Sequence, residues 1–222
     1  MAGNTALKRS GYTWNDYRSW DNGQRWEIVG GQAYAMAPAP ATRHQIVTGE
    51  LFGQLREFFA GKKCRPAISP VDVKLSQADV VQPDIVVVCD PRQIRPSHIE
   101  GAPAHVVEVL SPFTEVFDRG RKMDLYARSG VKEVWLVTPY PSLIEVFLLA
   151  DGGYRRVHAY AVDESFESPS FPGLELNLPR LFDFQIAPGE RIDMVREGRP
   201  PYGRKPGRTG SCMDNTRSRS MK

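Results

Sequence analysis

Two acidic residues interrupt apolar stretches of the sequence in which valine would be expected. Asp84 stands at the head of Ile85–Val88, and Glu108 stands in the middle of residues 105–110. A carboxylate in a strand buried on both faces loses several kcal/mol of hydration, so it must be paired, protonated or bound to a cation. Because the two strands follow each other along the chain, we expect them to be neighbours in a sheet. The sequence therefore predicts a small cluster of negative charge.

Carboxylate oxygens at close quarters are the hard ligands that Mg²⁺ or Mn²⁺ prefers. Lys122 is a third candidate, on a helix predicted over residues 115–129. It lies one turn before Tyr126, on the face whose aromatic ring should point at the sheet. We expect its ammonium group to reach inward past its own stem, steady the carboxylates and help orient or activate an attacking water.

Structural alternatives stay open for each of these three residues. Asp84 could cap a turn after Pro83. Glu108 and Lys122 could form a buried bridge with no chemical role, and Lys122 could instead form a solvent-facing pair with Asp118, four residues earlier.

The hydrophobic pattern predicts the elements that position these residues. Residues 13–36 should form a short helix and two strands joined at Gly30 and Gly31. Residues 44–59 should form an amphipathic helix, with Thr42 as a cap and Gly61 closing it. The other predicted elements are strands at 71–75, 80–89, 105–110, 134–137, 144–148 and 154–160, and the helix at 115–129 that ends at Gly130. Such an order of strands and crossover helices predicts an α/β domain with a mixed sheet.

Charge and composition divide the 222-residue chain into three parts: a flexible N-terminus (1–11), a folded domain (12–197) and a tail (198–222). The chain carries +3 in total; the tail, with seven basic residues and one acidic residue, carries +6, so residues 1–197 carry −3. We expect the Gly-, Pro- and Ser-rich tail to be disordered. It could follow a nucleic-acid backbone or be a solvated tail with no partner.

Several classes of protein are excluded by what the sequence lacks. Apolar runs reach only five residues, as at 85–89, so no membrane span is expected, and the polar start is not that of a secretory signal. The three cysteines, Cys64, Cys89 and Cys212, have no zinc spacing, which favours reduced thiols and a cytoplasmic location. The GxSxG, GxGxxG and P-loop patterns of serine hydrolases, dinucleotide-binding folds and P-loop NTPases are absent.

The candidate residues belong to a series of motifs with a defined order. These are W-E-I-V-G-G at 26–31, R-H-Q at 43–45, V-Q-P-D-I-V-V-V at 81–88, V-V-E-V-L-S-P at 106–112, D-R-G-R-K at 118–122, L-Y at 125–126, G-V at 130–131, W-L-V at 135–137 and Tyr154. Over roughly residues 12–184 the chain resembles the Uma2 family (DUF820), described as putative restriction-endonuclease-like proteins of the PD-(D/E)xK nuclease superfamily.

The resemblance implies a fold, a metal site and an activity. The fold would be a restriction-endonuclease-like core, with a mixed central sheet flanked by helices, an N-terminal hairpin and extra C-terminal strands. Asp84, Glu108 and the carbonyl of Val109 would hold Mg²⁺ or Mn²⁺. The usual lysine, two positions after the glutamate, is replaced here by Leu110, and Lys122 would act in its place.

Two residues of the early helix are secondary candidates. Glu50 lies near the edge of the apolar stripe, where related folds often place a carboxylate, and His44 at the helix start could contact phosphate. For both residues we give more weight to a structural role. The expected function is metal-dependent endonucleolytic hydrolysis of DNA, and a homodimer is a possible assembly. The alternative is an inactive module of the same fold that binds nucleic acid or protein.

Overall fold

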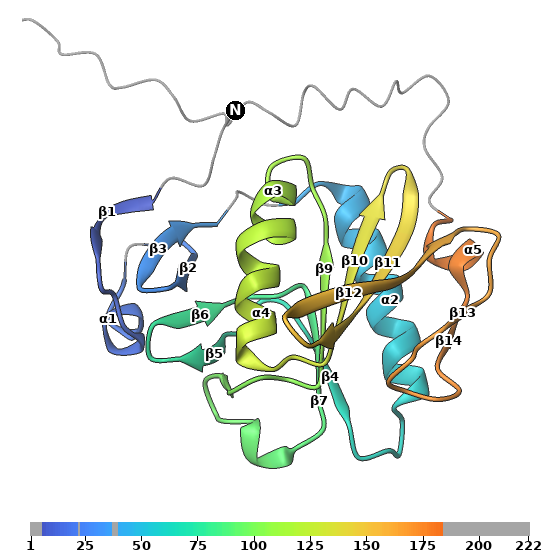
Figure 1. Ribbon diagram of the computed structural model, residues 1–222, viewed down its shortest axis with the longest axis horizontal. Coiled ribbons are helices and arrows are strands. Elements are labelled where there is room, and N and C mark those ends of the chain that lie inside the picture. Colours follow the sequence, from blue (N-terminus) through green and yellow to red (C-terminus); the bar gives the residue numbers. More distant parts are fainter. Residues whose placement is uncertain (1–5, 22, 37–39, 184–222) are drawn as a thin grey trace, which may run out of the picture.

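The computed structural model describes residues 6–21, 23–36 and 40–183, with only the backbone of residues 6–10. The strands form two six-stranded sheets and one two-stranded sheet. Helices lie on either side of one six-stranded sheet, the central sheet (Figure 1). The predicted basic tail, the boundary at residue 197 and Cys212 lie outside the described residues. Within the described part, no helix has the length and apolarity needed to span a membrane.

The central sheet has the strand order β12-β11-β10-β9-β7-β4. Strands β9 and β10 are parallel and the other neighbours are antiparallel, so the predicted mixed sheet is confirmed. Its strands are β4 (Arg65–Ile68), β7 (Ile85–Val88), β9 (His105–Val109), β10 (Glu133–Pro139), β11 (Ser142–Ala150) and β12 (Gly153–Ala161).

Each face of the central sheet is covered by a different helix. Helix α2 (Thr42–Phe58) packs Val47, Leu51 and Leu55 against one face. The other face is covered by a continuous helical segment made of α3 (Glu115–Phe117), a π-helical turn (Asp118–Lys122) and α4 (Met123–Ser129). It ends, as predicted, at Gly130 in the left-handed conformation with φ of 85°. Alternate residues of β9 face opposite helices, so Glu108 lies on the α4 side.

The second sheet has the order β1-β3-β2-β6-β5-β8 and packs beside the first. The predicted hairpin is confirmed as β2 (Trp26–Val29) and β3 (Gln32–Ala35), preceded by α1 (Trp14–Arg18). Part of the expected flexible N-terminus forms β1 (Ala6–Ser10), which pairs with β3. The remaining strands are β5 (Val73–Ser76), β6 (Asp79–Val81) and β8 (Ile99–Glu100), the last of which follows a 3₁₀ turn at Pro91–Gln93.

The single strand predicted over residues 80–89 is wrong. The chain forms β6 in one sheet and β7 in the other, with a break at residues 82–84. Pro83 has no N–H for a ladder, and the N–H of Gln82 is instead donated to the side chain of Glu27 over 2.9 Å. The break releases Asp84 from the ladder and lets it stand at the head of β7.

Two smaller predictions also need correction. Thr42 is the first residue of α2 rather than its cap, because Ala41 has the extended backbone of an N-cap and makes no side-chain bond. Cys64 and Cys89, expected as free thiols, form a disulfide. Arg65 of β4 lies opposite Val88 of β7, so the next residues outward, Cys64 and Cys89, face each other across the antiparallel pair with Cα atoms 4.0 Å apart.

Beyond β12, the chain forms β13 (Phe166–Glu167), β14 (Glu175–Leu176) and α5 (Leu178–Leu181), which close the α2 face of the core. The carboxylate of Glu133 anchors this segment to the central sheet. It accepts bonds from Trp135 Nε1 at 2.6 Å and from the backbone N–H of Ser170 at 2.9 Å.

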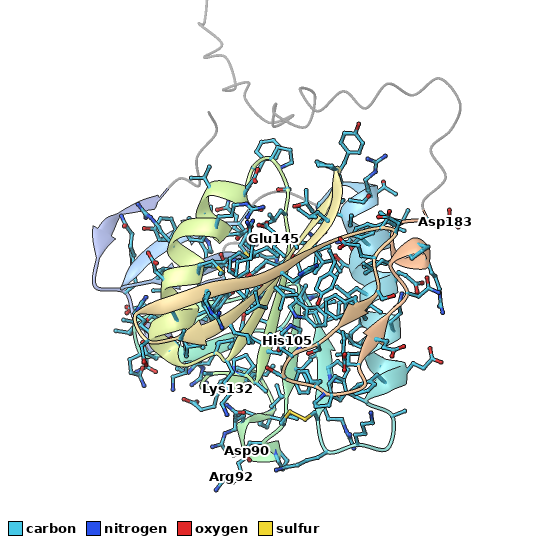
Figure 2. The ribbon with its side chains drawn as sticks, turned by 45° about the vertical axis from the view of Figure 1, so that its right-hand side comes forward. Asp90, Arg92, His105, Lys132, Glu145 and Asp183 are labelled. Carbon is cyan, nitrogen blue, oxygen red and sulfur yellow. A yellow bond between two sulfur atoms is a disulfide. The ribbon has the colours of Figure 1, made fainter. Side chains whose placement is uncertain are left out.

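His105 lies in the interior of the molecule at the start of β9, packed against Trp135 (Figure 2). Burial lowers the pKa of His105 to about 3, and neither ring nitrogen has a hydrogen-bond partner in the structure. Below pH 6.5 the imidazole of His105 therefore binds a proton in the unfolded chain but stays neutral in the folded chain. The free energy of unfolding consequently falls as the pH drops from 6.5 towards 3.

We expect His105→Leu to remove this pH dependence. At pH 5 the wild-type free energy of unfolding should have lost about 2 kcal/mol through this histidine, a loss that the variant lacks. Urea unfolding of both proteins at pH 7 and pH 5 measures the difference. Equal losses in the two proteins would show that His105 titrates normally in the folded state.

Candidate active site

Pairing of β7 with β9 brings the two predicted carboxylates to the same end of the central sheet. Ile85 lies opposite Val107, so Asp84 and Glu108 are the next residues along the two strands. The two carboxylates also interact electrostatically, because the charge of Asp84 contributes to raising the pKa of Glu108. The two strands predicted to be neighbours are therefore neighbours.

Lys122 lies at the centre of a cluster of acidic side chains. Its Nζ is 3.0 Å from Glu27 Oε1, 3.2 Å from Glu108 Oε1 and 3.3 Å from Asp118 Oδ1. All four residues are at most 5% exposed. Burial by itself would lower the pKa of Lys122, but the charges of Glu108, Glu27 and Asp118 outweigh it and raise that pKa well above its ordinary value. Lys122 is therefore charged, and the predicted inward direction of its side chain agrees with the structure.

Asp118 and Lys122 both point inward from the π-helical turn. Residues four apart lie on the same side of a helix, and both of these side chains are buried. The solvent-facing pair considered above is therefore wrong in its location, although the two groups do form an ion pair. Burial is the main cause that raises the pKa of Asp118, and Lys122 opposes it.

Glu108 has two protein donors, and both reach the same oxygen. Tyr126 donates its hydroxyl to Oε1 over 2.5 Å, beside the Lys122 contact. Burial raises the pKa of Glu108 well above the ordinary value; Lys122 lowers it, while Asp118, Asp84 and Glu27 add to the rise. The buried bridge between Glu108 and Lys122 is thus present. The other carboxylate oxygen of Glu108, Oε2, accepts neither of these two hydrogen bonds.

Asp84 is the more accessible of the two predicted carboxylates. Its side chain is 19% exposed, and Oδ2 accepts a 2.8 Å bond from the N–H of Val109 rather than capping the turn after Pro83. His44 Nε2 of α2 lies 3.4 Å from the same oxygen. Burial opposes protonation of His44, but hydrogen bonds with Asp84 and the backbone of Val109 raise its pKa overall.

Two of the five predicted side chains and the predicted carbonyl need separate comment. His44 joins the site through Asp84, whereas Glu50 does not: its carboxylate pairs with Arg180 Nε at 2.8 Å and Gln54 Nε2 at 3.1 Å, next to α5. Val109 is present at the site through its backbone. Within residues 6–21, 23–36 and 40–183, no three or more His, Cys, Asp or Glu side chains are arranged as a ready metal cage.

Sequence reasoning missed three members of the cluster, namely Glu27, Asp118 and Tyr126 as a hydrogen-bond donor. Glu27 had a signal, because it is an acid in the apolar stretch 26–29 of a predicted strand. That stretch obeys the same burial argument as Glu108. Asp118 also had a signal, because it stands four residues before Lys122, whose side chain was expected to point inward.

Comparisons with known proteins identify the family of this chain. Residues 14–179 match the Uma2 family, described as "Putative restriction endonuclease". The chain belongs to the Uma2 family. It is 30% identical over 159 residues to "Uncharacterized protein slr1290" of Synechocystis sp. (strain ATCC 27184 / PCC 6803 / Kazusa), covering 70% of this chain and 83% of that protein.

A solved structure shares the fold of this Uma2 protein. The crystal structure of a putative nuclease belonging to DUF820 from Anabaena variabilis ATCC 29413 superposes with a TM-score of 0.62 and 20% sequence identity. The match covers 77% of this chain and 97% of that chain. The expected restriction-endonuclease-like fold, with its mixed sheet and flanking helices, is thereby confirmed, and Uma2 membership supports a nuclease role.

The ion cluster predicts a large stability effect at Lys122. Replacing it in Lys122→Met should destabilise the protein by about 3–5 kcal/mol, because three buried carboxylates lose their common cation. The deficit should shrink in mildly acidic buffer, where the carboxylates can accept protons. Urea unfolding at pH 7 and pH 5 measures both effects; a variant as stable as wild type at pH 7 would refute this role of Lys122.

Proposed function

We propose that this Uma2 protein is a metal-dependent endonuclease that hydrolyses phosphodiester bonds of DNA. The observation that carries the proposal is the convergence of Asp84, Glu108 and Lys122 at one end of the sheet, in a chain of this family. Asp84, whose side chain is 19% exposed, marks the side from which a phosphate would approach.

The donor set fits a small hard cation. Three carboxylates, those of Glu27, Glu108 and Asp118, contact Lys122, and a fourth, that of Asp84, adds to the charge felt by Glu108. Mg²⁺ keeps several waters and is usually held by only one or two carboxylates together with substrate phosphate oxygens. Asp84, Glu108 through Oε2 and the carbonyl of Val109 are the groups that would hold it, so a cage of three side chains is not required. Mn²⁺ has similar ligand preferences.

When bound, the ion supplies Lewis-acid polarisation of the scissile phosphate and a lowered pKa for a coordinated water. The residues of the chain do the positioning. Lys122 and Tyr126 hold Glu108 Oε1, and the Val109 N–H holds Asp84 Oδ2, so both carboxylates are oriented before substrate arrives. The ammonium group of Lys122 also adds positive potential beside the charge that develops on phosphate oxygens.

His44 and the start of α2 supply a positive approach to Asp84. The first turn of α2 has no acidic residue, and Ala41 provides no side-chain cap. The positive end of the helix dipole and the protonated form of His44 therefore both favour a phosphate near this edge.

A non-catalytic module of the same fold is the second candidate, and one observation favours it. Asp84 and Glu108 each have protein donors of their own, as in a structural ion-pair network. Such a module would bind nucleic acid or protein without cutting. Homodimer formation stays a prediction.

Plasmid nicking with Glu108→Gln separates the two candidates. Under the proposed function, wild type nicks plasmid in Mg²⁺ and stops in EDTA. Glu108→Gln keeps the shape of the side chain but removes its charge, so it should lower nicking at least a hundredfold.

Glu145→Gln is the matched control. Glu145 is also a buried carboxylate, and it lies on the same face two strands away, in register with Leu136 and Glu108 (Figure 2). It pairs with Arg119 and Arg156 rather than with the candidate site. Its variant should nick like wild type. No Mg²⁺-dependent nicking by wild type would support the non-catalytic module instead.

A further inference from the structure

Exposed apolar side chains gather at the end of the molecule where Asp84 is accessible. Among the described residues, the large apolar side chains that are exposed are Ile46, Ile94, Val116 and Tyr140. Ile46 is near the start of α2, Val116 is in α3 and Tyr140 is at the tip of the β10–β11 hairpin. These three segments lie together at one end of the fold (Figure 1). Exposed apolar residues that cluster around a site indicate a surface for binding.

Tyr140 combines an exposed aromatic ring with a contact to helix α2. It is 50% exposed in the short connection between β10 and β11. The guanidinium carbon of Arg43 lies 5.7 Å from the centre of its ring, which braces the ring against α2. Arg43 is the neighbour of His44, and His44 contacts Asp84. The ring therefore contacts the same turn of α2 that carries the histidine at the accessible carboxylate.

We propose that Tyr140, braced by Arg43, is a stacking platform for an unpaired nucleobase next to the phosphate that is cut. The inference rests on the proposed function and names its substrate class: single-stranded DNA, or DNA with unpaired ends or flaps. A half-exposed ring offers its face to a base, whereas the bases of an intact duplex are already stacked on one another. Ile46 and Val116 are the other exposed apolar side chains at this end of the fold, and together with Tyr140 they make up the apolar rim.

The charge of the body makes contacts other than phosphate attraction necessary. Residues 1–197 carry −3 in the sequence. A net-negative body gains little from the phosphates of either a single strand or a duplex, but an unpaired base can add stacking on an aromatic ring, which a paired base cannot.

Fluorescence anisotropy tests this proposal with the full-length chain in EDTA, where the proposed cleavage is blocked. The probes are a fluorescein-labelled oligothymidylate and a duplex of matched length. We expect wild type to bind the single strand more tightly than the duplex. Tyr140→Leu keeps apolar bulk but removes the ring, so it should weaken single-strand binding about tenfold and leave duplex binding unchanged. Tyr140→Phe, which keeps the π face, should bind like wild type.

Arg92→Ala is the control for loss of an exposed residue elsewhere, because Arg92 lies in the loop at the far end of the molecule from the rim (Figure 2). It should bind both probes like wild type. Thermal unfolding of each variant checks that the fold is kept. If Tyr140→Leu binds the single strand as well as wild type, or loses both probes equally, the platform is refuted.

Failure of the platform and failure of the proposed function give different results. A wild-type chain that nicks plasmid in Mg²⁺ but shows no dependence on Tyr140 overturns the platform alone. A chain that binds neither probe and nicks nothing overturns both.

Discussion

The position of the Lys122 ammonium group among three carboxylates is the interaction on which the architecture of the site depends. Glu27 comes from the hairpin of the second sheet, Glu108 from the central sheet and Asp118 from the helical segment that covers it. One cation therefore joins three parts of the chain that are far apart in sequence. In a low-dielectric interior a buried carboxylate needs a nearby positive charge, and these three share the single charge of Lys122. Removing any one of them therefore changes the electrostatic potential at the other two. Glu27 extends this coupling further, because it also accepts the N–H of Gln82 and so supports the break that frees Asp84.

Most of the fold could be predicted from the sequence because its signals are local. The hairpin at 26–35, the amphipathic helix α2 and the cap at Gly130 follow from periodicity and from glycine, and all are confirmed. The split of residues 80–89 into two strands was not predicted, since an apolar run does not reveal which sheet it joins. Pro83 was recognised as a poor ladder residue, yet its real effect, moving the chain from one sheet to the other, depends on tertiary pairing. The facing of Cys64 and Cys89 likewise follows only from the register of β4 with β7.

The site was predictable to the extent that burial conflicts with charge. Asp84, Glu108 and Lys122 stood out for that reason, and the structure brings them to one end of the sheet. Glu27 obeys the same rule but sits in a short strand near an aromatic stretch, where the conflict is less visible. Asp118 stands four residues before Lys122 and shares its inward face, although the pair was also considered as facing solvent. Glu50, chosen for its place near an apolar stripe, instead fixes α5 against α2 through Arg180.

Charge balance sets this cluster apart from a neutral buried ion-pair network. A structural network is most stable when its charges cancel, because each unpaired buried charge costs hydration. Here three carboxylates share Lys122 and a fourth, Asp84, contacts His44; burial raises the pKa of Glu108, and the charges of the neighbouring carboxylates add to that rise. The fold thus carries an electrostatic cost that hydrogen bonds from Tyr126 and Val109 offset only in part. Under the proposed function, a divalent cation held near Asp84, the carboxylate of this group that is most exposed to solvent, would offset that cost.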